Sequence, residues 1–239
     1  MLKDPEIKRA QYQAQNTHTE EQIATDLVKE KIERQIQTLE QLSLKYQDKA
    51  DIILTSIEKI QPHPESTIEP QPIQELNQIE AQSGGIYWRT ITKNIIHPKW
   101  AFPGRTSKNA TDPINATLKY AYAILESECW KAIHKTGLDP YEGFLHKDKI
   151  GRASFIYDLI EPFLYIVDRV VLNLHDKNQL KKKDYIMTNR EHCRIKTPLT
   201  TTIIDKMNKA LNKIIIYYEK EMMLRTTIQN NARDIKELL

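Results

Sequence analysis

The sequence predicts an all-α protein, and three observations support this fold class. The 239 residues include 6 Gly, about 2.5% against an average of about 7%, which argues against an all-β fold with many tight turns. Apolar residues recur at intervals of three and four over long stretches, as in amphipathic helices. Short alternating runs that would indicate strands are scarce.

The N-terminal part predicts long amphipathic helices. Residues 1–20 are polar and aperiodic, so we expect them to be poorly ordered. An apolar series over residues 23–42 predicts one face of a helix. The series continues, with an expected break, over residues 53–60.

A proline-rich connector separates two predicted domains. Four prolines lie within residues 61–72 and indicate an extended segment. The next helix should begin near Ile73 and cover Tyr87. We therefore expect an N-terminal segment of amphipathic helices over residues 1–62 and a helical domain, one cooperative unit, over residues 63–239.

The clearest helix lies in the middle of the chain. Residues 97–113 contain three prolines and a glycine and predict a loop. Apolar residues at 118, 122, 125, 129 and 133 follow the helical spacing. Asp112 or Thr111 is placed to cap this helix, and Gly137 is placed to end it in the left-handed conformation.

The C-terminal half continues the helical pattern. An apolar series over residues 155–174 predicts a helix, and Pro162 within it indicates either a first turn or a kink. Residues 175–201 are basic and irregular. Apolar residues over 204–218 predict the last helices.

Composition excludes several classes of protein. The chain has no glycine-rich dinucleotide or P-loop motif, no apolar run near 18 residues and no apolar leader at its N-terminus. The two cysteines are too few for a disulfide framework or a thiolate zinc site. Cys129 lies in an apolar stripe and should be a core residue, whereas Cys193 lacks partners for a metal site. We expect a soluble, intracellular protein with no membrane association.

The charge is divided unevenly along the chain. The whole sequence has 35 Lys and Arg against 32 Asp and Glu, a net charge of +3. Residues 1–82 hold 9 basic and 15 acidic residues, a net of −6, so residues 83–239 hold 26 and 17, a net of +9. A basic body favours binding to a polyanion such as nucleic acid, although ordinary surface charge is the alternative.

Four ionisable residues are candidates for a metal site. Glu80 lies on a predicted helix, His146 closes the run GLDPYEGFLH, and Asp158 and Glu161 share one helix face. Carboxylate oxygens suit Mg²⁺, and an added imidazole admits Mn²⁺. Their spacing is not a motif in itself, so solvated carboxylates and a core histidine are the alternative.

The run DPINATLKYAYAILESECWKAIHKTGLDPYEGFLH, continued by GRASFIYDLIEPFLYIVDRVVL, resembles CRISPR-associated protein one, the endonuclease that inserts new spacers into a CRISPR repeat array. Three features carry the resemblance: Asn115, the run over residues 137–146 and the run over residues 158–163. The text IEAQSGGIYW matches the family's upstream glutamate at Glu80. The helix IATDLVKEKIERQIQTLEQL looks like the family's Lys- and Gln-bearing helix. The resemblance covers roughly residues 20–235.

The resemblance implies a site and a reaction. The metal ligands would be Glu80, His146 and Glu161, holding Mn²⁺ or Mg²⁺, with Asp158 as an acidic neighbour. The four would form the catalytic set of an integrase that joins a free DNA 3′-OH to a phosphodiester of the repeat. Its partners would be double-stranded DNA, further copies of the chain in a dimer or tetramer, and a small ferredoxin-like protein.

The chain departs from the family pattern at three places. The family begins with a β-rich domain that is expected to be missing here. Leu164 stands where the family usually has an arginine. The chain stops soon after Ala232, so the usual C-terminal tail is expected to be short or absent.

Phosphate contacts from basic side chains would hold DNA of any sequence. Tyr87, Trp88 and Trp100 are placed either to stack on bases or to pack inside the helical domain. For each basic residue, a solvated surface charge is the alternative. The candidates are Arg89, Lys93, Lys99, Arg105, Lys108, Arg152, Arg169, Lys181, Lys182, Lys183, Arg190 and Arg194.

Two other functions remain open from the sequence. A transposon-encoded relative would act on transposon ends rather than on spacers. A non-catalytic helical subunit would bind DNA or assist assembly without turnover, although the presence of Glu80, His146 and Glu161 argues against this.

Overall fold

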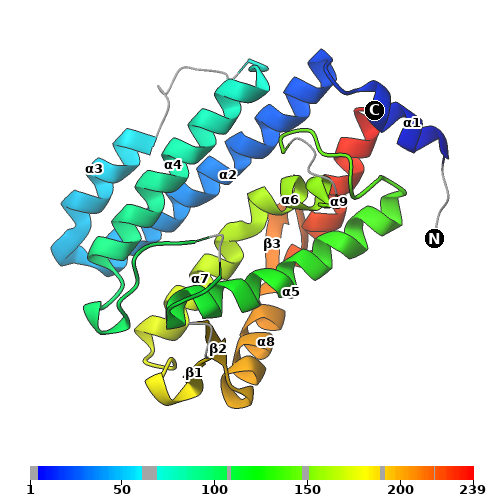
Figure 1. The fold of residues 1–239 in the computed structure, drawn as a ribbon. Coiled ribbons are helices and arrows are strands. Elements are labelled where there is room, and N and C mark those ends of the chain that lie inside the picture. Colours follow the sequence, from blue (N-terminus) through cyan, green and yellow to red (C-terminus); the bar gives the residue numbers. More distant parts are fainter. Residues whose placement is uncertain (1–4, 61–68, 107–108, 147–150, 189–191, 218) are drawn as a thin grey trace.

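The computed structural model describes residues 5–60, 69–106, 109–146, 151–188, 192–217 and 219–239. These residues form a helical molecule with two small antiparallel strand pairs (Figure 1), so the all-α prediction is confirmed. The longer helices are α2 (His18–Lys45), α3 (Ala50–Ile60), α4 (Ile73–Asn94), α5 (Pro113–Thr136), α7 (Leu164–Asp176), α8 (Thr197–Leu211) and α9 (Leu224–Glu237).

Helices α2, α3 and α4 lie side by side and form one layer (Figure 1). The predicted break between α2 and α3 is a short 3₁₀ turn, η1 (Gln47–Lys49). The inner face of α2 buries the apolar series that the sequence indicated, together with Lys31 and Gln35. These helices share one apolar core with the rest of the described chain, and the domain boundary near residue 62 stays a prediction.

Helix α5 crosses the second half of the molecule and contacts α7, α8 and α9. Its N-terminus is capped by Asp112, whose side chain accepts the N–H of Asn115 at 2.9 Å. Gly137 ends the helix with φ of 83°, a conformation that other residues rarely adopt. Cys129 is fully buried on this helix, as expected.

Pro162 breaks the helical series that the sequence predicted over residues 155–174. Helix α6 (Ser154–Ile160) gives way to the 3₁₀ turn η3 (Glu161–Phe163), and α7 then begins at Leu164. Proline lacks an N–H donor and its ring clashes with the carbonyl four residues earlier. The resulting turn packs against α2, which carries Glu161 to that helix.

The expectation that residues 1–20 are poorly ordered is wrong for the part that the structure describes. Residues Pro5–Gln13 form helix α1, and Gln11 is fully buried. Its amide donates to the backbone carbonyls of Asp139 and Glu142 and accepts the N–H of Asp139. Ile7 joins the core from this helix, but the polar contacts of Gln11 add to it, and periodicity does not reveal them.

Two hairpins lie where the sequence predicted an irregular stretch and a helix. In the basic stretch, β1 (Tyr185–Met187) pairs with β2 (Cys193–Ile195), with Ile186 opposite Arg194. The predicted last helix is wrong beyond Leu211, since β3 (Ile214–Tyr217) pairs there with β4 (Lys220–Met223). The run of three isoleucines explains this, because β-branched side chains favour strands.

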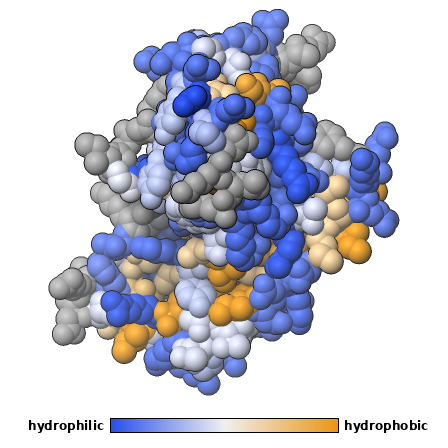
Figure 2. Space-filling view, turned by 90° about the vertical axis from the view of Figure 1, so that its right-hand side faces the viewer, coloured by the Kyte–Doolittle hydropathy of each residue, from blue (hydrophilic) through white to orange (hydrophobic). Residues whose placement is uncertain are grey.

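Hairpin β3–β4 leaves apolar side chains in solvent. Ile214 and Ile216 are exposed. Figure 2 shows a face that is hydrophilic over most of its area, with several separate hydrophobic groups, most of them in its lower half. Exposed apolar residues are common on protein surfaces.

Candidate active site

The loop that carries His146 is built on the carboxylate of Asp158. This side chain is fully buried and accepts the backbone N–H groups of Phe144, Leu145 and His146 at 2.5, 3.0 and 3.0 Å. Gly143 precedes these donors, and a Cβ atom there would lie 2.8 Å from Oδ2 of Asp158. The close approach of backbone to carboxylate therefore requires glycine at this position.

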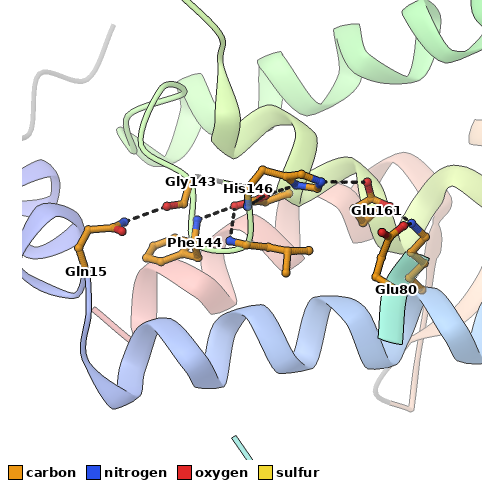
Figure 3. A network of polar contacts seen from close by, with 9 residues as sticks. Gln15, Glu80, Gly143, Phe144, His146 and Glu161 are labelled. Atoms are coloured by element: carbon orange, nitrogen blue, oxygen red, sulfur yellow. Dashed lines mark hydrogen bonds and ion pairs between the residues drawn. The ribbon is translucent and has the colours of Figure 1, made fainter. Parts of the chain in front are cut away.

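Asp158 also orients the imidazole of His146. Its Oδ1 lies 2.7 Å from Nδ1 of His146, while Nε2 lies 4.0 Å from Oε1 of Glu161 (Figure 3). A proton held on Nδ1 by a carboxylate leaves the lone pair of Nε2 free to bind a cation. Burial opposes the charge of His146, but the hydrogen bond and charge of Asp158, with the charge of Glu161, raise its pKa.

Lys31 joins the two glutamates of the predicted site. Its ammonium contacts Oε1 of Glu80, from α4, and Oε2 of Glu161, from η3. Lys31 is 4% exposed. Burial opposes its charge, but the carboxylates of Glu161 and Glu80 outweigh burial and raise its pKa.

A cavity of about 240 Å³ opens beside this cluster. Its wall includes Lys31, Glu80 and Glu161 but not His146, together with groups from α2, α4, α5 and α7. Trp88 contributes one side, and Gly84 and Gly85 leave space where side chains would otherwise project. The lining residues are Lys31, Gln35, Glu80, Ala81, Gly84, Gly85, Trp88, Arg105, Tyr122, Glu161, Leu164, Tyr165 and Asp168.

A buried aspartate lies in the wall of this cavity. Asp168 is 3% exposed and accepts the hydroxyls of Tyr87 at 3.0 Å and Tyr122 at 2.5 Å. Burial raises its pKa to about 6, although the two hydroxyls and the charges of Arg105 and Lys31 act in the opposite direction. Arg105 reaches the cavity with its guanidinium 5.0 Å from the Tyr122 ring centre.

The structure brings the predicted ligands together but does not arrange them as a formed metal site. Glu80 and Glu161 meet at one nitrogen, and His146 lies beside Glu161. Within the described part of the chain, no group of three or more His, Cys, Asp or Glu has metal-binding geometry. Asp158 faces the backbone of the His146 loop, so it positions the histidine.

The predicted DNA-binding residues are spread over several surfaces. Arg105 lines the cavity, and Arg169 donates to Thr38 at 2.9 Å. Arg89, Lys93, Lys99, Lys181, Lys182, Lys183 and Arg194 are exposed, and Arg152 is partly exposed with its guanidinium over Tyr157. Lys108 and Arg190 lie outside the described residues. Their contacts to DNA stay predictions.

The aromatic candidates divide between packing and the cavity. Tyr87 and Trp100 are buried, at 0% and 4% exposed, which confirms the packing alternative. Trp88 is partly buried and lines the cavity.

Sequence reasoning missed Lys31 and Asp168. Both interrupt apolar stripes: Lys31 lies three residues after Val28 and beside Ile32, and Asp168 lies beside Val167 and three residues before Val171. A charged residue on the buried face of a helix needs a partner, and this signal was present in the sequence.

None of the described helices is long and apolar enough to cross a membrane.

Comparison with known proteins identifies the family. The family model for CRISPR associated protein Cas1 matches residues 1–209. The CRISPR-associated endonuclease Cas1 1 of Archaeoglobus fulgidus is 29% identical over 249 residues, covering 97% of this chain and 72% of that protein. The endonuclease Cas1 1 of Francisella tularensis subsp. novicida is 28% identical, covering 88% of this chain and 62% of that protein.

Solved structures share the fold. A casposase bound to its integration product matches with a TM-score of 0.82 and 29% identity, covering 97% of this chain and 69% of that chain. A Cas1 protein from Thermotoga maritima matches with a TM-score of 0.79 and 20% identity, covering 99% and 71%. The helical fold and these relatives define a nucleic-acid-handling protein of the endonuclease and integrase type. The chain belongs to the Cas1 family of CRISPR-associated proteins.

Proposed function

We propose that the chain is a metal-dependent DNA integrase and endonuclease of CRISPR adaptation, which joins the 3′-OH ends of captured DNA to a repeat by transesterification. The observation that carries the proposal is the meeting of Glu80 and Glu161 at one point, with Nε2 of His146 beside them. The relatives named as endonucleases support the nuclease class.

The donor set suits a hard or borderline divalent cation. Two carboxylates and one neutral imidazole are ligands that Mn²⁺ accepts, and Mg²⁺ takes the carboxylates with water. Glu80, His146 and Glu161 would hold the ion. When bound, the ion would polarise the scissile phosphate and offset the charge that develops on it.

The protein's own groups have separate tasks. Asp158 holds the proton of His146 on Nδ1, so that Nε2 stays available to the cation. Leu164 lines the cavity where the family usually has an arginine, but Arg105 lines the same cavity. We infer that Arg105 supplies a phosphate-facing cation there, because a guanidinium matches the geometry of phosphate oxygens.

Replacement of the ligands tests the proposal. His146→Ala and Glu161→Ala should abolish Mn²⁺-dependent joining of a short duplex to a repeat-bearing plasmid, because each removes a ligand. DNA binding, measured by fluorescence anisotropy at fixed salt, should stay nearly unchanged, because backbone contacts to basic residues supply it. His134→Ala, on α5 outside the cavity, is the matched control. Wild-type joining rates in either ligand variant would remove the site from consideration.

A second function is favoured by one observation. The casposase structure has the higher TM-score of the two structures compared above, which supports a transposon-type integrase that acts on transposon ends. The same joining assay separates the two, because terminal inverted repeats and CRISPR repeats can be offered as competing targets. A protein that binds DNA but joins neither target would be the non-catalytic subunit.

The proposed assembly also follows from the relatives. A complex that contains Cas1 and Cas2 shares the fold with a TM-score of 0.75. We propose that this chain binds double-stranded DNA as a dimer or tetramer, with a small ferredoxin-like partner, because each end of an insert needs its own active site. Light scattering with and without DNA and the partner measures the assembly.

A further inference from the structure

Lys31 lies at the point where the proposed cation would bind. Its ammonium contacts one oxygen of Glu80 and one of Glu161, so both carboxylates face the same atom. Three elements meet there, because Lys31 belongs to α2, Glu80 to α4 and Glu161 to η3. With Lys31 removed, two carboxylates of like charge would face each other in a mostly buried place.

A divalent cation and this ammonium cannot share the same two carboxylate oxygens. The carboxylates have limited charge, and two cations a few ångströms apart repel strongly where water is excluded. A bound metal therefore requires the ammonium to withdraw. The flexible four-carbon stem of lysine permits such a movement.

The cavity provides a place for the displaced ammonium. Lys31 and Asp168 both line it, and the positive charge of Lys31 acts to lower the pKa of Asp168. Asp168 accepts two tyrosine hydroxyls, which are neutral donors. A carboxylate of this kind is a favourable second partner for an ammonium.

We propose that Lys31 is a positioning residue that occupies the metal position in the metal-free protein and is displaced toward Asp168 when a divalent cation binds. The proposal rests on the proposed metal site. Lys31 holds one carboxylate oxygen of Glu80 and one of Glu161 at the same atom before the cation arrives. Because it competes for the same oxygens, it also lowers the affinity of the site for metal.

Binding of Mn²⁺ alone, without DNA, tests this role. Lys31→Met should bind Mn²⁺ about tenfold more tightly or better, measured by electron paramagnetic resonance of free Mn²⁺, because a competing charge is removed. Its melting temperature without metal should fall below that of the wild type. The rise in melting temperature on addition of Mn²⁺ should be larger in Lys31→Met than in the wild type.

Lys45→Met is the matched control, because Lys45 lies on the same helix and pairs with Asp176 outside the site. It should lose stability without a change in Mn²⁺ affinity. Lys31→Gln gives a second neutral side chain that can still donate hydrogen bonds to both carboxylates, and it should also bind Mn²⁺ more tightly than the wild type. Equal or weaker Mn²⁺ binding in both Lys31 variants would overturn the proposal.

A further variant distinguishes this proposal from the one on which it rests. Glu161→Gln should lose Mn²⁺ binding in an otherwise wild-type chain. If wild type and Glu161→Gln bind Mn²⁺ equally, the metal site and the role of Lys31 both fail. If Glu161→Gln loses binding but the Lys31 variants bind no more tightly than wild type, the metal site stands and the role of Lys31 fails.

Discussion

At the scale of single residues, one buried carboxylate organises the loop that carries His146. Asp158 accepts three backbone N–H groups and contacts the imidazole of His146. Hydrogen bonds to an ionised acceptor are stronger than those between neutral groups. The side chain thus replaces the regular backbone partners that the loop over residues 143–146 lacks, and it fixes the direction of the histidine ring.

Removal of this carboxylate should cost much stability. Asp158→Ala leaves three N–H groups without their acceptor, so we expect the free energy of unfolding to fall by about 3 kcal/mol or more. Urea unfolding monitored by circular dichroism measures it. Asp205→Ala is the control, because its exposed pair with Lys209 should contribute less than about 0.5 kcal/mol. Equal losses in the two variants would contradict the role given to Asp158.

The residues of the site differ in how well the sequence predicted them. Glu80, His146 and Glu161 were indicated by their chemistry and by the family resemblance, and the structure places them near one another. Lys31 was not predicted, because helical periodicity marks which face is buried but not which distant side chain a buried charge will meet. That partner depends on the packing of α2 against α4 and η3.

At the scale of elements, the ends of α2 and α7 are joined by a polar contact. Asp176, near the end of α7, pairs with Lys45 and accepts the hydroxyl of Tyr46 at 2.5 Å. Although burial opposes it, hydrogen bonds from His175, Lys45 and Tyr46 lower the pKa of Asp176 to about 2. The contact thus fixes α2 to the helix that follows Glu161.

This contact should give a pH-dependent contribution to stability. Because the folded pKa of Asp176 lies below its unfolded value near 4, the contribution is present above pH 4 and is lost as pH falls to about 2. A shift of about two units corresponds to about 2.5 kcal/mol. Lys45 is half exposed, so solvent screening reduces this to about 1–2 kcal/mol.

Asp176→Asn should therefore lower the free energy of unfolding by about 1–2 kcal/mol at pH 7, and the difference from wild type should shrink between pH 4 and pH 2. Urea unfolding at a series of pH values measures it. Asp26→Asn, an exposed position on α2, is the control. A difference that stays constant over this pH range would contradict the assignment.

The elements also differ in how far the sequence predicted them. Helix α5 was predicted with both of its ends, because an Asp cap, an apolar stripe and a terminal Gly agree. Helix α1 was missed because buried amides hold it. Hairpin β3–β4 was mistaken for a helix, because Ile214 continues the helical spacing of α8 although the isoleucine run favours a strand.

At the scale of the whole molecule, several polar contacts along α2 fix it to the second half of the chain. Lys31 contacts Glu161, Thr38 accepts the Nε–H of Arg169, and Lys45 pairs with Asp176. The apolar side chains of α2 also belong to the common core. The two predicted domains are therefore held together by these polar contacts and by one common apolar core.

This arrangement predicts one cooperative unfolding transition. The three tryptophans lie at positions 88, 100 and 130, so their fluorescence reports on residues 63–239. Far-ultraviolet circular dichroism also reports on α2 and α3. Both signals should change at the same urea concentration, because neither half buries its core alone. Two separated midpoints would show that residues 1–62 unfold independently.

The N-terminal region contacts the loop that carries His146, far along the chain. Gln11 and Gln15 of the N-terminal region hold the backbone of residues 139, 142 and 143, a few positions before His146. Any binding partner, fused domain or affinity tag that displaced helix α1 would break these hydrogen bonds and change the position of the His146 imidazole. Fusions and tags should therefore be attached at the C-terminus, so that the contacts of Gln11 and Gln15 stay intact.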